Sequence, residues 1–266
     1  MKLRAHVPTQ QYGFMEIEGD PEEAREIERL YNHYAETPVK FKSANSPNAK
    51  RVECLVGGSI LYDPVAHIYT NDAGDDYLSG SAYAKQFDKP FDMQAIASKM
   101  EAKSGVPASE IIAIWKLKGQ ASASFGTSVH EAMELFGKHK NACIKLDKEY
   151  HVSAIPVINA IVADFFNNFK GREKEEALYE PMIADHKRKW AGQIDRLIIT
   201  GDKKCVIGDY KTNADMTPAK IETYTNQLSF YASIMEAGGW TVEGMELYHL
   251  DTTWKTIKLE RKAIKE

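Results

Sequence analysis

Two aspartates and one lysine lie within a predicted β-hairpin that spans residues 190–212. If its turn is centred on Asp202, the two strands pair so that Asp195 lies opposite Asp209. Lys211 shares a face with Asp209, because side chains alternate along a strand with a period of two. Two carboxylates about 5 Å apart repel each other unless a positive charge lies between them, and a divalent cation is one such charge. The spacing therefore predicts either a structural ion pair or a metal site, and it leaves both open.

Apolar runs accompany these charged residues in both strands. Leu197–Ile199 and the run at 206–208, Val-Ile-Gly, are typical of central strands that are buried on both faces. Charged groups at or beside such strands are costly to bury unless they pair with each other or bind a metal.

Apolar periodicity and turn residues predict the elements that position this hairpin. Two or three short strands are expected over 51–70, followed by a loop at 71–76. The later expected elements are helical pieces over 82–138 with breaks near 88–92, 105–107 and 119–126, a helix at 153–170, strands at 178–183, 190–200 and 203–211, a helix at 217–237, and strands at 240–250 and 254–259. The helix at 153–170 carries an apolar stripe that we expect in the core: Ile155, Ile158, Ile161, Val162, Phe165, Phe166 and Phe169. This order predicts an α/β (α+β) fold with a mixed central β-sheet flanked by helices.

The formal net charge of −4 is concentrated at the N-terminus, where residues 1–36 hold eight acidic and four basic side chains. A strand at 12–18 and a helix that begins with Asp20 and Pro21 are expected there. We expect residues 1–45 to form a small acidic strand–helix appendage and residues 46–266 to form the main domain. Basic clusters in the main domain are either solvated surface or phosphate contacts: 138–140, 187–189, 203–204 and the C-terminal tail.

Composition excludes several classes of protein. Three scattered cysteines without a CxxC pair argue against a zinc ribbon or an iron–sulfur cluster and favour a reducing compartment. No apolar run approaches the roughly 18 residues that cross a bilayer, so we expect a cytoplasmic protein without a membrane partner. No P-loop motif occurs, so no nucleotide cofactor is expected.

Four motifs together resemble the PD-(D/E)XK nuclease superfamily. Gly192-Gln-Ile-Asp195 followed by Asp209-Tyr-Lys211-Thr is similar to its Asp…(Asp/Glu)-x-Lys core. The segment from Gly126 to Glu134, Gly-Thr-Ser-Val-His-Glu-Ala-Met-Glu, resembles the GTxxHxxxE helix of the RecB-like branch, which includes phage-encoded exonucleases. Gln227-Leu-Ser-Phe-Tyr231 resembles the QxxxY helix of that branch. The resemblance covers roughly residues 110–250 and implies a restriction-endonuclease-like core.

The resemblance also implies roles for individual residues. Asp195, Asp209 and Lys211 would be catalytic. One or two Mg²⁺ or Mn²⁺ ions would be held by Asp195, Asp209, His130 and the backbone carbonyl of Tyr210, oxygen and imidazole ligands that suit these cations. Lys211 would orient or deprotonate the attacking water and stabilise the charge that develops on phosphorus.

For four further residues, the sequence leaves both a functional and a purely structural role open. Gln227 and Tyr231 share a helix face and would contact DNA, although packing alone also explains that spacing. Glu134 lies either behind His130 or on the surface, and it stands where a zinc HExxH motif requires a second histidine, which excludes that motif. Glu180 either approaches the metal or is an edge-strand acid beside a proline.

The resemblance implies a metal-dependent DNA exonuclease of phage-type recombination, replication or repair, acting in the cytoplasm of a bacterial host. Its partners would be DNA and either a second copy of the chain, a single-strand annealing or binding protein, or a helicase. The alternatives are an endonuclease or flap/CRISPR-adaptation-like nuclease of the same superfamily, and a catalytically silent DNA-binding or scaffold protein. The silent protein is disfavoured because each catalytic position holds a competent residue.

Overall fold

The computed structural model describes residues 3–9, 13–19, 48–88, 91–147, 152–168 and 176–264. Near the N-terminus, β1 (Leu3–Thr9) and β2 (Gly13–Gly19) form an antiparallel hairpin. The strand predicted at 12–18 corresponds to β2, whereas β1 was not predicted. The helix predicted after Asp20 lies outside the described residues, and the division into 1–45 and 46–266 stays a proposal.

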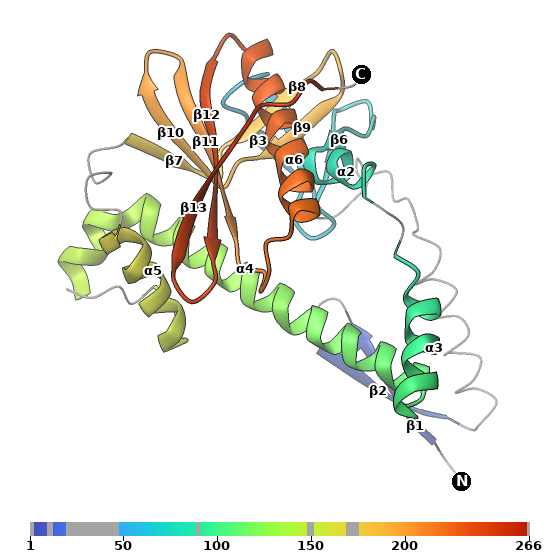
Figure 1. The fold of residues 1–266 in the computed structure, drawn as a ribbon. Coiled ribbons are helices and arrows are strands. Elements are labelled where there is room, and N and C mark those ends of the chain that lie inside the picture. The colour runs from blue at the N-terminus through green and yellow to red at the C-terminus, as the bar shows by residue number, and fades with distance from the viewer. Residues whose placement is uncertain are drawn as a thin grey trace.

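A five-stranded mixed sheet forms the centre of the fold (Figure 1). Its strands, in spatial order, are β13 (Trp254–Leu259), β12 (Thr241–Leu250), β11 (Lys204–Lys211), β10 (Arg196–Gly201) and β7 (Glu176–Tyr179). Only β11 and β12 are parallel in this sheet, and α6 (Pro218–Ala237) connects them in sequence. The mixed α+β architecture agrees with the predicted fold class.

Helices cover both faces of this sheet. On one face, Ile207 and Leu247 pack with α6 residues such as Leu228 in one buried cluster. On the other face, Tyr210 and Tyr248 pack with side chains of α4 (Ala108–Asp147) and α5 (Pro156–Asn168). The apolar stripe predicted for α5 is largely confirmed. Ile158, Val162 and Phe165 are buried in the core, and Ile161 and Phe166 pack against it. Ile155 is 49% exposed, and Phe169 lies outside the described residues.

Two strands that the sequence predicts as continuous are each broken between sheets. The strand expected at 178–183 divides into β7 and β8 (Met182–Asp185), and the strand expected at 190–200 divides into β9 (Trp190–Gln193) and β10. β8 and β9 belong to a second sheet, in the order β6 (Leu78–Ser79), β9, β8. The breaks lie side by side, because the Glu180 amide donates to the Asp195 carbonyl at 3.2 Å. Pro181 cannot donate a ladder hydrogen bond, and Glu180 has a left-handed φ of 54°.

A third sheet contains β3 (Lys50–Glu53), β4 (Ser59–Asp63) and β5 (Ile68–Thr70), as predicted for 51–70. It packs on β8 and β9 through a core that includes Ile60, Tyr69 and Met182. A loop follows at 71–76 and leads to β6, as expected.

The helical region differs from the prediction at two points: α4 has no break at 119–126, and it runs to Asp147, past the expected end at 138. α2 (Gly80–Lys85), α3 (Met93–Ser104) and α4 are separated near 88–92 and 105–107, as expected, and Gly105 ends α3 with a left-handed φ of 72°. The break expected at 119–126 was wrong, because α4 continues through it (Figure 1). The segment contains two glycines but no proline, and each glycine costs only about 1 kcal/mol in a helix. The kink in α4 lies instead at His139, whose φ is −121°. Among the described residues, no helix is long and apolar enough to cross a membrane.

Candidate active site and metal centre

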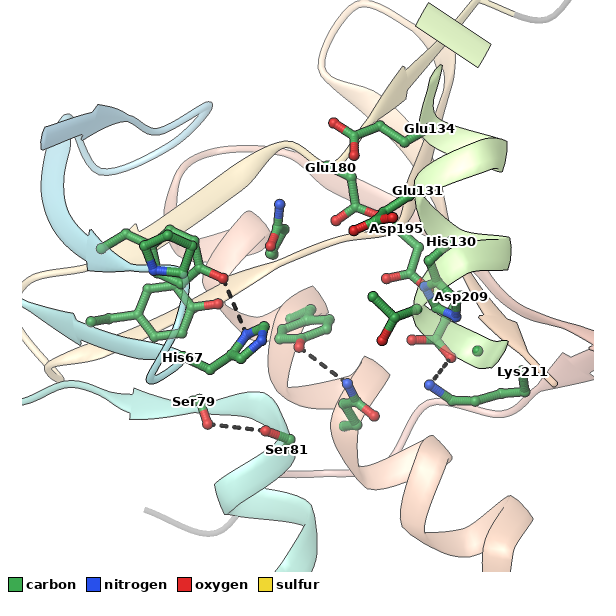
Figure 2. Close-up of a pocket in the computed structure, with 18 residues that line it drawn as sticks. His67, Ser79, Ser81, His130, Glu131, Glu134, Glu180, Asp195, Asp209 and Lys211 are labelled. Atoms are coloured by element: carbon green, nitrogen blue, oxygen red, sulfur yellow. Dashed lines mark hydrogen bonds and ion pairs between the residues drawn. The ribbon is translucent and has the colours of Figure 1, made fainter. Parts of the chain in front are cut away.

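A pocket of about 580 Å³ lies where α4, the β9–β10 break, the end of β11 and α6 meet (Figure 2). Eight residues singled out in the sequence line it: His130, Glu134, Glu180, Asp195, Asp209, Lys211, Gln227 and Tyr231. The ninth, Tyr210, directs its buried side chain into the α4–α5 side of the core. The fold therefore brings together side chains that are up to 101 positions apart in sequence, from 130 to 231.

Asp195 lies at the point where the β10–β11 ladder ends. Arg196 pairs with Gly208, which is the register that a turn centred on Asp202 predicts. Because the chain then turns away into β9, the Asp195 carboxylate takes the place of a backbone acceptor and receives the Tyr210 amide at 2.8 Å. Asp195 itself thus stands in the break and not inside a strand, which corrects the expected strand at 190–200. Its Oδ2 also lies 3.3 Å from Nδ1 of His130.

Asp209 and Lys211 form a close ion pair on β11. Lys211 Nζ lies 2.5 Å from Asp209 Oδ2, and the two side chains are 17% and 6% exposed. Burial raises the pKa of Asp209 to about 6, although the charge of Lys211 opposes this shift. Burial would lower the pKa of Lys211, but Asp209 and Asp195 raise it above the ordinary lysine value. The lysine is therefore an ammonium ion at neutral pH, and it also lies 4.7 Å from the centre of the Tyr224 ring.

Glu180 enters the pocket from the other broken strand. Ligand atoms of Glu180, Asp195 and His130 lie within 4.8 Å of one another. Burial, and next the charge of Asp195, raise the pKa of Glu180 to about 9. Glu180 thus belongs to the group of residues that could hold a metal. Of the two alternatives for Glu180, this favours an acid that approaches the metal over a surface acid on an edge strand.

The α4 residues are oriented by an apolar stripe on the same helix. Val129, Met133 and Phe136 are fully buried, and this places His130 beside the pocket with 30% of its side chain exposed. Glu134, one turn further along, forms an ion pair with Lys138 at 2.5 Å. Its charge also contributes to the raised pKa of Glu180.

Gln227 and Tyr231 contact each other across one turn of α6. The Gln227 amide donates to the Tyr231 hydroxyl at 3.1 Å. The Tyr231 ring is held between two glycines, since a Cβ on either Gly80 or Gly192 would lie 2.3 Å from its Cε1. Tyr231 is 6% exposed, so its ring serves packing while its hydroxyl end lines the pocket.

The opposite wall of the pocket was not predicted from the sequence. Figure 2 shows His67, Ser79 and Ser81 across the pocket from Asp195 and Asp209. Tyr62 and Tyr69 also line this side. These residues carry no spacing motif, and the only available signal was the turn sequence that begins at Asp63.

The donor set fits a divalent cation. Carboxylate oxygens and one imidazole are ligands that Mg²⁺ and Mn²⁺ accept. Burying these carboxylates close together raises the pKa values of Asp209 and Glu180, which is the electrostatic cost that a bound cation removes.

A comparison with known protein families agrees with this chemistry. The model of the PD-(D/E)XK nuclease superfamily matches residues 108–265, which include every site residue predicted above. No curated protein matches the chain. One similar solved structure is the crystal structure of SSO0001, with 14% identity, a TM-score of 0.29, and coverage of 52% of this chain and 67% of that chain. The family match spans more than half of the chain, so the chain belongs to the PD-(D/E)XK nuclease superfamily, whose members are metal-dependent nucleases.

Proposed function

We propose that this protein is a metal-dependent DNA exonuclease that hydrolyses phosphodiester bonds in phage-type recombination, replication or repair. The observation that carries this proposal is the convergence in one pocket of the His130–Glu180–Asp195 group with the Asp209–Lys211 pair. Its substrate is DNA. For processive degradation it would act with a second copy of the chain, with a single-strand annealing or binding protein, or with a helicase.

The metal would be held by His130, Asp195 and Asp209, together with the Tyr210 carbonyl. Glu180 is an additional ligand candidate, because its carboxylate lies in the same group of ligand atoms. When bound there, a divalent cation would supply Lewis-acid chemistry, polarising the scissile phosphate and lowering the pKa of a nearby water.

Lys211 acts as a cation in this proposal. Asp209 and Asp195 hold it in the ammonium form, so it suits stabilising negative charge on the phosphate better than removing a proton. Asp209 fixes its position through the 2.5 Å ion pair, and Asp195 is held in turn by the Tyr210 amide. A preorganised ammonium of this kind needs no reorganisation as charge develops during attack.

We propose an exonuclease and not an endonuclease because the Gly126–Glu134 and Gln227–Tyr231 motifs resemble those of the RecB-like branch, and the pocket size is compatible with this choice. Its volume of about 580 Å³ is within the range of small-ligand sites, and walls stand on two sides of it. A pocket of this size can accept the end of a DNA strand.

The proposal is tested with linear DNA labelled at the 5′ or the 3′ end, single- and double-stranded, beside a closed circle. Each substrate is incubated with Mn²⁺, Mg²⁺ or EDTA. We expect metal-dependent release of label from linear DNA and an intact circle, with loss of at least about 100-fold in rate in Asp209→Ala and Lys211→Ala. Cleavage of the circle would instead identify an endonuclease.

The matched control is a second Asp–Lys pair outside the pocket. Lys255 Nζ lies 2.9 Å from Asp251 Oδ2, and both side chains are largely exposed. Asp251→Ala and Lys255→Ala should keep wild-type activity. Metal-dependent cleavage that survives in Asp209→Ala would contradict the proposed site.

A further inference from the structure

The pocket has two walls of different character. Five carboxylates line the metal side: Glu131, Glu134, Glu180, Asp195 and Asp209. The facing wall is formed by β4, β5 and the turn between them, by β6 and by the start of α2. It contributes six described residues, none of them acidic: Tyr62, Pro64, His67, Tyr69, Ser79 and Ser81. A DNA strand with one phosphate at the acidic wall can place its neighbouring phosphate against this second wall, where no carboxylate among those six repels it.

His67 is held rigidly at the β4–β5 turn. The Asp63 carboxylate accepts the amides of Val65 and Ala66 at 2.8 and 3.0 Å, and His67 follows with a left-handed φ of 52°. Its Nδ1 lies 3.1 Å from the Tyr62 hydroxyl, and the Tyr62 ring is stacked on Tyr69 at 4.9 Å. The imidazole therefore has a fixed position although it is exposed.

The turn itself does not require a histidine. The β8–β9 turn repeats the arrangement, because Asp185 accepts the amides of Lys187 and Arg188, and Lys189 has a φ of 53°. The fifth residue of such a turn is left-handed in both hairpins, but it is a lysine in one and a histidine in the other. Backbone geometry thus accounts for the conformation of His67 and leaves its side chain to be explained.

The hydrogen bond to Tyr62 engages Nδ1 of His67 and leaves Nε2 for a ligand. Burial, followed by the charges of Glu180 and Asp63, raises the pKa of Tyr62, so its hydroxyl keeps its proton and can donate to Nδ1. A neutral imidazole that accepts at Nδ1 carries its proton on Nε2. Nε2 is then a hydrogen-bond donor, and phosphate oxygens are acceptors only.

We infer that His67 is a DNA-binding residue that donates a hydrogen bond from Nε2 to the phosphate next to the scissile one, and so positions the strand across the pocket. This inference rests on the proposed nuclease function. Its role is binding of the strand and not hydrolysis, because the reacting groups lie on the opposite wall (Figure 2).

The test is a double-mutant cycle, in which a change in the protein is combined with a change in the DNA. His67→Asn is used because asparagine tolerates a left-handed backbone but cannot reach as far. Single methylphosphonate groups, which lack the charged oxygen, replace each phosphate near the end of a short oligonucleotide. We expect His67→Asn to raise KM about 5- to 20-fold with kcat within about twofold. At one position next to the scissile phosphate, the methylphosphonate should weaken wild-type binding by a similar factor and leave His67→Asn unaffected.

A chemically matched control lies outside the pocket. His186 Nδ1 is 2.6 Å from the Tyr77 hydroxyl, and the two rings meet edge to face at 5.7 Å. His186→Asn should change neither KM nor the methylphosphonate penalties. Tyr62→Phe, which keeps the ring but removes the hydrogen bond that orients His67, should give an intermediate rise in KM.

Binding measured by fluorescence anisotropy in an Asp209→Asn background separates the two ways to fail. If no form of the protein cleaves DNA, the proposed function fails, and the binding cycle still decides the role of His67. If cleavage is normal but every methylphosphonate penalty is the same in wild type and His67→Asn, the inference about His67 is overturned.

Discussion

At the scale of single residues, the backbone of Glu180 is in a conformation that ordinary residues avoid. Glu180 has a φ of 54° and stands directly before Pro181. A positive φ at a residue other than glycine costs about 1–3 kcal/mol. The outcome is a carboxylate placed within 4.8 Å of the ligand atoms of His130 and Asp195. The strained backbone places a carboxylate in a pocket that is already acidic, and without a cation both the strain and the charge repulsion lower the stability of the fold. This combination is expected of a metal ligand.

The first prediction concerns stability against pH. The pKa of Glu180 is about 9 in the folded protein against 4.5 as the reference value, mainly through burial. The folded state therefore favours the protonated carboxyl of Glu180. In metal-free protein, the free energy of unfolding is highest below pH 4.5 as far as Glu180 is concerned. It falls as pH rises from 4.5 towards 9, because over this range the carboxyl ionises in the unfolded state but not in the folded state. Glu180→Gln should be more stable than wild type by roughly 1–2 kcal/mol at pH 8 in EDTA, and equal to it near pH 4.5.

Guanidinium unfolding at both pH values measures this difference. Glu101→Gln, on the exposed side of α3, is the control and should not change the pH dependence. Addition of Mn²⁺ at pH 8 should stabilise wild type more than Glu180→Gln. A variant that loses stability at pH 8 in EDTA would refute the assignment.

At the scale of elements, the paired breaks in the long hairpin shape the site. The β10–β11 register follows from the turn at Asp202 and the two apolar runs, and the sequence predicted it correctly. The breaks at Glu180 and Asp195 escaped prediction because each depends on the other: the Glu180 amide bonds to the Asp195 carbonyl, 15 positions away. The false helix break at 119–126 has the opposite cause, since local glycine propensity was overridden by packing at both ends of α4.

The second prediction tests how closely α6 packs on β9. A Cβ on Gly192 would lie 2.3 Å from the Tyr231 ring, which is buried and has little room to move. Gly192→Ala should therefore destabilise the protein by about 1–3 kcal/mol and lower nuclease activity by displacing Tyr231 and Gln227. Urea unfolding and initial rates measure the two effects.

Gly119→Ala supplies the contrasting variant within α4. A Cβ there has no atom within 4 Å, so alanine should stabilise the helix by about 0.5–1 kcal/mol. A neutral Gly192→Ala would show that Tyr231 is not held by this contact. A destabilising Gly119→Ala would contradict the continuous helix.

At the scale of the whole molecule, the pocket is assembled from two parts of the chain. The acidic wall lies within residues 108–265, which match the family model, whereas the facing wall comes from residues 62–81. Motif spacing found the first wall because metal chemistry restricts residue types. It could not find the second, because His67 reaches the pocket through the packing of β3–β5 on β8 and β9, and Ser81 reaches it through the packing of α2 on α6.

The last prediction tests the proposed division at residue 45. The buried clusters and the pocket are formed by described residues from Val52 onward, including both walls of the site. A chain of residues 46–266 keeps all of these described core and pocket residues, so it should fold and should cleave short single-stranded oligonucleotides within about twofold of the full-length rate. Circular dichroism melting and end-label release measure both properties. Loss of activity in a folded 46–266 chain, with EDTA-sensitive cleavage retained by the full chain, would instead make residues 1–45 part of the DNA-binding surface.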